Sequence, residues 1–187
     1  MQDSYAYLED LSSPATERFA AEAHTETLAR FCADEAFAAL AADITAQLQD
    51  ERQIPFCQEH RGRMYHFYQN AQYLKGVYRV CSAASYRAGM PDWQVLFAVA
   101  DFDEVLGDDV YLDGVSHYVE APHQALLTLS SAGADAAYTV EFDLKAGAIV
   151  AGGFHFPAGK NHIAWRDENS VCSAASYRAG MPDWQVL

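Results

Sequence analysis

Two stretches near the start of the chain carry apolar residues at helical spacing. Residues 14–32 are rich in Ala, Glu, Arg and Leu, and a serine pair followed by Pro14 is typical of a helix start. A second helix is predicted after Asp34, whose carboxylate can cap its first turn. Its apolar residues form one stripe, which consists of Phe37, Leu40, Ala41, Ile44 and Leu48. Because Pro55 disfavours helix at the residue before it, we place a boundary after residue 53.

From residue 54 onward the pattern changes to short strands separated by turns. Residues 64–68 alternate with a period of two, and a polar turn over 69–76 ends in a glycine. The remaining strands are expected at residues 76–84, 93–99, 110–118, 125–130, 137–144, 148–156 and 162–166. Residues 3–10, which precede the helices, show no helical period and are expected to be an extended arm or a turn. The pattern predicts an α+β fold: helices at 1–53, then antiparallel meanders, as in a propeller blade or a sandwich.

One stretch of the chain occurs twice. Residues 80–96 recur letter for letter as residues 171–187. Propeller blades diverge in sequence, so identity of this kind is not blade periodicity. It indicates a recent duplication, a cloning artefact or an error of sequence assembly. We therefore divide the β region into residues 54–170 and a duplicated tail, 171–187. The tail is expected to lack a settled place and to pair with an exposed sheet edge, which predicts self-association.

Composition and charge limit the classes of binding partner that are expected. The chain has 187 residues, 51% of them hydrophobic, and a net charge of -14. This suits a folded domain with a real core, whereas an acidic surface disfavours nucleic acid and anionic membranes as partners. No apolar run reaches the roughly 20 residues of a membrane span. The start of the chain lacks the features of a signal peptide, so a cytoplasmic location is expected.

The cysteines do not indicate a disulfide framework. They are Cys32, Cys57, Cys81 and Cys172, and none lies in a C-x-x-C pair. Cys172 is the duplicate of Cys81. Free thiols are therefore expected.

No segment of the sequence carries a catalytic nucleophile motif. Residues 114–118 come closest to the G-x-S-x-G elbow of serine hydrolases, but Tyr118 stands where the second glycine belongs. Ser116 and His117 are neighbours on a predicted strand, so their side chains point to opposite faces. A structural role is expected for both, and we assign no catalytic residue.

Two polar clusters resemble metal sites only superficially. Pro122 interrupts the group His117, Glu120 and His123, whose spacing matches no zinc motif. The acidic group consists of Asp101, Asp103, Asp108 and Asp109. It fails the EF-hand pattern, because Val105 and Leu106 occupy positions that need a ligand and a glycine. A solvated loop and an acidic turn are expected instead. No glycine pattern fits a nucleotide, so neither a metal nor a cofactor is predicted.

Aromatic side chains are concentrated in the first strands. They are Tyr65, Phe67, Tyr68, Tyr73, Tyr78, Tyr86 and Trp93. They could form a binding surface, but strand aromatics more often fill a core or pair across strands, and we favour this second interpretation.

Several segments resemble the N-terminal part of prolyl oligopeptidase-type serine peptidases. The opening D-S-Y-A-Y-L-E-D is similar to that family's D-P-Y-x-W-L-E-D, with Ser4 in place of Pro and Tyr7 in place of Trp. Residues 93–96, 129–135, 141–144 and 164–165 resemble the family's propeller segments. The likeness covers residues 3 to 170.

The resemblance implies an architecture and a function. In that family the first helices pack against a C-terminal α/β-hydrolase domain, and a seven-bladed β-propeller restricts access to short peptides. The chain would then be an incomplete β-propeller with its helical arm, and the α/β-hydrolase domain would be its missing partner. The parent enzyme would hydrolyse short peptides through a Ser-Asp-His triad outside this chain, which alone would be inactive but would gate and position substrate. The alternative is a free-standing β-rich binding module without catalysis.

Overall fold

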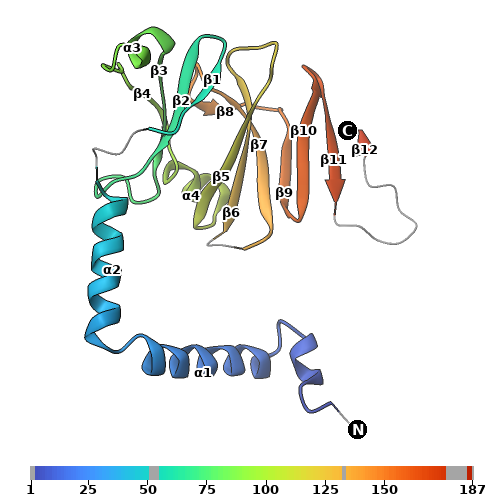
Figure 1. Cartoon of the computed structure of the whole chain (residues 1–187). Coiled ribbons are helices and arrows are strands. Elements are labelled where there is room, and N and C mark those ends of the chain that lie inside the picture. Colours follow the sequence, from blue (N-terminus) through green and yellow to red (C-terminus); the bar gives the residue numbers. More distant parts are fainter. Residues whose placement is uncertain (1–2, 51–54, 132–133, 176–184, 187) are drawn as a thin grey trace. The chain divides into compact units, whose positions relative to one another are not determined.

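The computed structural model describes residues 3–50, 55–131, 134–175 and 185–186 (Figure 1). The chain divides into two compact units, Met1–Asp50 and Glu51–Leu187. The first unit consists of helices and the second of antiparallel sheets. None of the described helices is long and apolar enough to cross a membrane.

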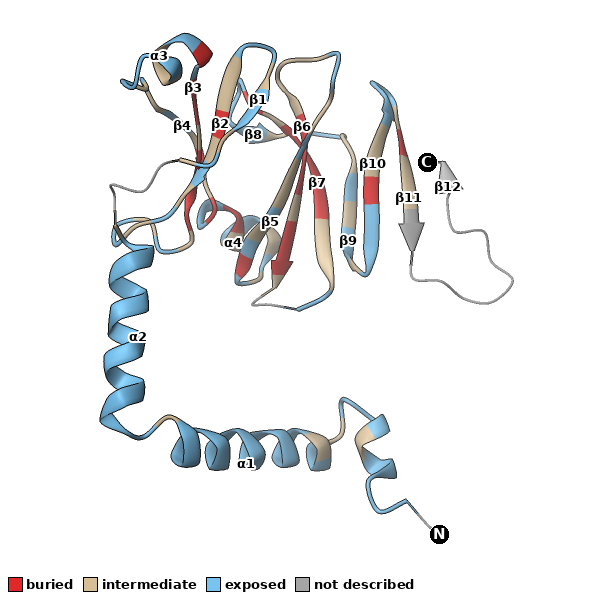
Figure 2. Ribbon diagram, viewed as in Figure 1, coloured by how far each residue is buried: buried red, intermediate tan, exposed pale blue. Residues whose placement is uncertain are grey.

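The first unit contains η1 (Ala6–Glu9), α1 (Pro14–Phe31) and α2 (Glu35–Leu48). The predicted helix starts are confirmed: the Ser13 side chain accepts a hydrogen bond from the backbone N–H of Thr16, and Asp34 accepts one from that of Phe37 at 2.7 Å. Residues 3–10 are not an extended arm throughout, because η1 is a short 3₁₀ helix. Neither α1 nor α2 contains a buried residue (Figure 2).

The second unit begins with a sheet in the order β1-β2-β3-β4, formed by β1 (Gln58–His60), β2 (Arg63–Tyr68), β3 (Val77–Ser82) and β4 (Gln94–Ala98). Gly76 precedes β3 with φ of 87°, and a Cβ there would lie 2.3 Å from the ring of Phe67. Only glycine therefore suits this turn.

The strand predicted over residues 76–84 ends earlier than expected. Ser82 caps a short helix, α3 (Ala83–Arg87), by accepting a hydrogen bond from the backbone N–H of Ser85. The cap competes with the sheet ladder, so the chain turns away from β3 at this point.

A second sheet follows α4 (Asp101–Leu106) and contains β5 (Val110–His117), β6 (Gln124–Ser131) and β7 (Ala137–Asp143) in sequence order. The single strand predicted over residues 148–156 is wrong. Two short strands, β8 (Ala148–Ile149) and β9 (His155–Gly159), pair separately with β7. The chain between them turns at Gly152, which has φ of 75°.

The third sheet consists of β10 (Asn161–Asp167), β11 (Ser170–Ala175) and β12 (Gln185–Val186). The duplicated tail begins in β11, which pairs with β10 of the same chain. Val171 is fully buried and packs with Leu126 and Ile163. Residues 176–184 and 187 of the tail lie outside the described part of the chain.

One hydrophobic core joins the first two sheets (Figure 2). Its fully buried members include Val99, Val110, Leu127, Leu129 and Val140. The alternation along each strand places these side chains on one face, and the burial of so much apolar surface stabilises the unit. The observed fold matches the predicted helices followed by antiparallel meanders.

Candidate functional site

Ser116 and His117 lie side by side in β5 without forming a catalytic pair. The backbone carbonyl of Ser116 accepts a hydrogen bond from Trp165 Nε1 at 2.9 Å. His117 Nε2 lies 2.9 Å from the hydroxyl oxygen of Tyr78, on β3. The histidine is therefore engaged with the first sheet, and no hydrogen bond joins it to Ser116 among the described contacts.

His117 belongs to a packed group of rings at the junction of the first two sheets. Its ring stacks on that of His60, with centroids 4.9 Å apart and an interplanar angle of 25°, and it lies 4.3 Å from the ring of Tyr65. Burial, with a smaller contribution from His60, lowers the pKa of His117 to about 4. Burial thus favours the neutral form of the His117 ring.

Two nitrogen atoms of this group have unusual surroundings. His60 Nε2 and His117 Nδ1 are buried and have no hydrogen-bond partner among the described residues. A buried polar atom without a partner lowers stability, and a proton added there would create a buried charge. The contact between β1 and β5 therefore includes buried polar atoms that lower its stability.

The loop after β5 does not gather its polar residues into a metal site. The backbone carbonyl of Glu120 accepts a hydrogen bond from Arg61 Nη1 at 2.6 Å, and that of His123 accepts one from Leu144 N at 2.7 Å. In the part of the chain that the structure describes, no group of three or more His, Cys, Asp or Glu could hold a metal ion.

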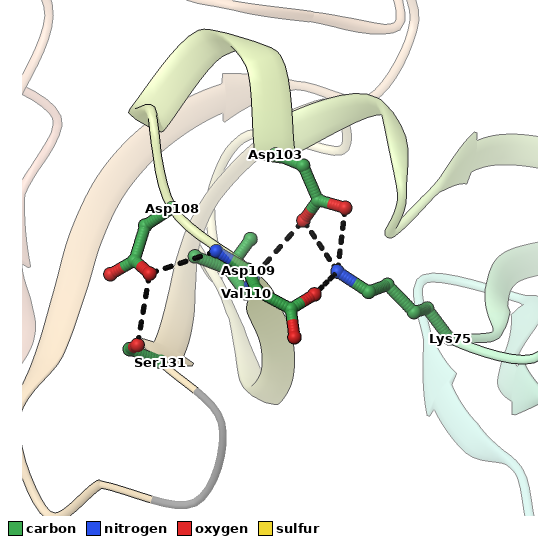
Figure 3. Close-up of polar contacts among 6 residues, drawn as sticks. All are labelled: Lys75, Asp103, Asp108, Asp109, Val110 and Ser131. Carbon is green, nitrogen blue, oxygen red and sulfur yellow. Dashed lines mark hydrogen bonds and ion pairs between the residues drawn. The ribbon is translucent and has the colours of Figure 1, made fainter.

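The acidic stretch is organised by a lysine that sequence analysis missed (Figure 3). Lys75 Nζ donates to both carboxylate oxygens of Asp103, at 2.7 and 2.6 Å, and forms an ion pair with Asp109. Asp103 also accepts a hydrogen bond from the backbone N–H of Val110 at 3.0 Å. The hydrogen bond from Lys75 is the main reason that the pKa of Asp103 is lowered.

The other aspartates of this stretch have structural roles as well. Asp108 accepts hydrogen bonds from Ser131 Oγ at 3.0 Å and from the backbone N–H of Asp109 at 2.8 Å (Figure 3). Asp101 opens α4, a helix where only an acidic turn was expected. A lysine in a polar turn carries no sequence signal for this pairing.

The aromatic residues divide between the core and one stacked group. Tyr65 and Tyr78 are buried, as the second interpretation of the sequence predicts. The guanidinium of Arg79 lies 3.8 Å from the ring centroid of Tyr68 and 4.5 Å from that of Trp93. Arg79 Nε also donates to His66 Nδ1 at 3.2 Å. Burial, followed by Arg79, lowers the pKa of His66 to about 4.

One pocket lies where the first sheet meets β5. It has a volume of about 230 Å³. Its lining consists of Phe56, Gln58, Tyr65, Phe67, Tyr78 and the β5 residues 112–115. We call it the bulge pocket, because the β5–β6 ladder has an irregularity between Leu112 and Gly114. A glycine inside a predicted strand is the sequence signal that could have indicated it.

A second pocket, of about 290 Å³, lies beside β7 and is lined in part by Glu141. Glu141 is 7% exposed and accepts hydrogen bonds from Gln124 Nε2 at 2.8 Å and from the backbone N–H of Phe154 at 3.0 Å. These bonds join β6, β7 and the segment before β9, so the carboxylate stabilises the sheet.

A family comparison matches most of the chain. The profile described as "Prolyl oligopeptidase, N-terminal beta-propeller domain" covers residues 1–172. The chain belongs to the prolyl oligopeptidase family. The resemblance seen in the opening motif and the strand segments is thereby confirmed.

Individual relatives in this family are distant in sequence. The chain is 26% identical over 179 residues to the uncharacterized peptidase y4nA of Sinorhizobium fredii, covering 95% of the chain and 25% of that protein. It is 24% identical over 148 residues to the uncharacterized peptidase RP174 of Rickettsia prowazekii, covering 79% of the chain and 20% of that protein. The chain therefore spans about a quarter of the length of its curated relatives or less.

A solved structure of the family has the same fold. The post-proline cleaving enzyme from Rickettsia typhi matches with a TM-score of 0.77 and 21% sequence identity, covering 93% of this chain and 26% of that one. The match includes both the helices and the sheets, since so little of the chain remains outside it. The sheets are thus part of a β-propeller that is incomplete within this chain.

Proposed function

We propose that the chain supplies the helical arm and the first propeller sheets of a serine peptidase that hydrolyses short peptides. In this proposal the sheets gate and position the substrate. Residues outside the chain form the catalytic α/β-hydrolase domain. The single observation that carries the proposal is the family match over residues 1–172. The name of the matched Rickettsia typhi enzyme supports cleavage after proline as the reaction of the parent.

The contacts of the polar residues support a non-catalytic role for this chain. A serine nucleophile needs a base within hydrogen-bond reach. His117, the histidine next to Ser116, instead contacts Tyr78 and has its pKa lowered to about 4 by burial. On α4 the carboxylate of Asp103 is paired with Lys75, which also forms an ion pair with Asp109 beyond the helix.

The helices support a role as a docking element for the rest of the enzyme. The stripe on α2 is exposed along its length, with Leu40 at 58%, Ile44 at 48% and Leu48 at 69%. Contiguous exposed apolar residues are typical of interaction sites. We assign this stripe to contact with the α/β-hydrolase domain.

Activity measurements on the purified chain test the proposal. We expect no cleavage of a chromogenic proline-containing peptide and no covalent labelling by a fluorophosphonate probe, because the chain lacks the nucleophile elbow. The Rickettsia typhi post-proline cleaving enzyme serves as the positive control. Stoichiometric labelling of any serine in this chain would overturn the assignment of catalysis to residues outside it.

A further inference from the structure

Arg79, on β3, carries a positive charge that has no acidic partner among the described residues. The chain has 26 Asp and Glu residues against 12 Lys and Arg. The ion pairs of the described residues join Lys75, Lys160 and Arg166 to aspartates, and none of them includes Arg79. Burial lowers the pKa of Arg79. Because charges withdrawn from water are normally paired, the guanidinium has capacity for an anion from outside this part of the chain.

The contacts around Arg79 hold its side chain in one place. The guanidinium lies 3.8 Å from the ring centroid of Tyr68 and 4.5 Å from that of Trp93. Tyr68 belongs to β2 and Trp93 directly precedes β4, and these two strands flank β3 in the sheet. Arg79 Nε also donates to Nδ1 of His66, which is a neutral acceptor at pH 7 because burial lowers its pKa to about 4. The guanidinium is therefore ordered before a ligand arrives, which reduces the entropic cost of binding.

The terminal nitrogens of Arg79 are open to solvent. Neither donates a hydrogen bond to a described residue, and neither is among the buried polar atoms that lack a partner in that part of the chain. Asp92, which precedes Trp93 in the sequence, does not fill this role. Its carboxylate instead accepts hydrogen bonds from Ser85 Oγ and from the backbone N–H of Ser82. Both terminal amino groups of the guanidinium therefore remain available as donors to a ligand.

We propose that Arg79 binds a carboxylate group, which is either the carboxyl end of a peptide or an acidic side chain of the ligand. A guanidinium presents paired N–H groups that match the two oxygens of a carboxylate. The net charge of -14 repels a phosphate dianion more strongly than a singly charged carboxylate, so the carboxylate is favoured. Arg79 is only half-buried, so solvent screens the attraction and affinities in the millimolar range are expected. The proposal rests on residues of this chain and does not depend on a role in a peptidase.

NMR on the full chain at neutral pH and low salt tests this with defined probes. N-acetylphenylalanine carries a terminal carboxylate, N-acetylphenylalaninamide has the same ring without the charge, and N-acetylglutamic acid α-amide carries a side-chain carboxylate. We expect saturable shifts of the Arg79 Nε–H and Trp93 indole N–H signals with both carboxylates, and much weaker shifts with the neutral amide. Whichever carboxylate binds more tightly distinguishes the end of a peptide from an acidic side chain. Inorganic phosphate should bind more weakly than either.

Two variants separate the charge of the guanidinium from its shape. Arg79→Gln removes the charge and should abolish the saturable shift of the Trp93 indole signal. Arg79→Lys keeps the charge without the paired N–H groups, and should weaken carboxylate binding by about threefold. Arg166→Gln removes the same charge from an exposed position on β10, where Arg166 pairs with Asp167, and should leave binding unchanged. The thermal unfolding midpoint establishes that each variant is folded.

Several results would overturn the proposal. Equal shifts with the carboxylate and amide probes, or no shift at millimolar concentrations, would show that Arg79 does not recognise a carboxylate. Unchanged binding in Arg79→Gln would place the site elsewhere, and tighter binding of phosphate would assign the site to another class of anion. If Arg79→Gln does not fold, the comparison of probes on the parent chain decides alone. Peptidase activity measured in a longer protein bears on the proposed function and not on this test.

Discussion

The helices of the first unit and the sheets of the second are specified in different ways. α1 and α2 begin at side-chain caps encoded within three residues of sequence, yet neither helix buries a residue. β6 and β7 pair residues that are up to nineteen positions apart, such as Gln124 and Asp143, and their apolar side chains are almost fully buried. Local sequence thus determines where the helices form, whereas distant contacts hold the sheets together.

This difference has an energetic consequence. Helices of 18 and 14 residues are close to the marginal length for helices in water, about 12–15 residues, unless an apolar face packs against a partner. The sheets already have their partners in one another. The helices of the first unit therefore lack the buried contacts that stabilise the sheets of the second.

The largest expected effect is a core deletion in the sheets. Phe142→Ala removes a side chain that is 1% exposed and should lower the free energy of unfolding of the β unit by roughly 3–5 kcal/mol. The matched change Phe31→Ala, at a residue 62% exposed on α1, should alter it by less than about 0.5 kcal/mol. Urea unfolding monitored by tryptophan fluorescence measures both, because the tryptophans follow residue 54. Equal losses of unfolding free energy in the two variants would contradict the difference between the sheets and the helices.

The next effect concerns the ion pairs of Lys75. Lys75→Met should destabilise the β unit by about 1–3 kcal/mol, because it leaves the carboxylates of Asp103 and Asp109 without their cation. Lys160→Met breaks a pair with Asp135 whose side chains are 63% and 80% exposed, and should cost less than about 1 kcal/mol. Urea titrations of the two variants provide the measurement. If Lys160→Met lowered the free energy of unfolding as much as Lys75→Met, burial of an ion pair would not determine how much it stabilises the β unit.

The same ion pair predicts an acid response. The pKa of Asp103 is lower in the folded chain than in the unfolded chain. Its ionised carboxylate therefore stabilises the fold at pH values above the pKa of the unfolded chain, and this stabilisation is lost as the pH falls through the pKa of the folded chain. Lys75→Met should therefore reduce the loss of stability in this acidic range. Thermal melts of the variant and the parent chain across this pH range measure the effect. If the melting midpoints of both depended on pH in the same way, Lys75 would not be the cause of the lowered pKa of Asp103.

The buried histidines should produce a response at milder pH. The pKa values of His117 and His66 are lowered from 6.5 to about 4, mainly by burial. Between these values the unfolded chain binds more protons, so stability is complete above pH 6.5 and falls as the pH approaches 4. His117→Gln should flatten part of this dependence, whereas His162→Gln, at an exposed position, should not. Melting midpoints at several pH values distinguish the two outcomes.

The smallest effect on unfolding is expected on α2. Replacing Leu40 and Ile44 by Ser should change the stability of the β unit by less than about 0.5 kcal/mol, because both side chains are exposed. It should reduce any self-association through the stripe. Analytical ultracentrifugation and urea unfolding of the double variant measure both quantities. Cooperative loss of the β unit would show that α2 already has a partner within the chain.

The sequence predicted the local features of the fold well. Ser13 and Asp34 mark helix starts because their side chains cap the first turn directly. Prediction from local sequence fails for the duplicated segment. Ala83 and Ala84 open α3, whereas the identical pair at 174 and 175 continues β11. No local rule can assign different structures to the same letters, so long-range context decides.

The pairing of the two copies shows the same dependence on context. In the first copy Val80 pairs with Gln94, whereas Ser173, the duplicate of Ser82, pairs with Gln185, the duplicate of Gln94. The register thus differs by two residues. For the candidate sites, motif analysis assigned no catalytic role to Ser116, and this assignment stays a prediction. It could not find the pairing of Lys75, which depends on a contact between segments far apart in the sequence, whereas Gly114 was a signal for the bulge at Asp113.

Hydrogen exchange across the whole chain tests the central claim most directly. We expect strong protection of the amides of β6 and β7 and much faster exchange of those of α1 and α2, because the helices have no buried face to resist opening. Amides of α2 protected as strongly as those of β7 would show that the helical unit is already stabilised within this chain. The stripe on α2 would then not be a surface kept for a missing domain.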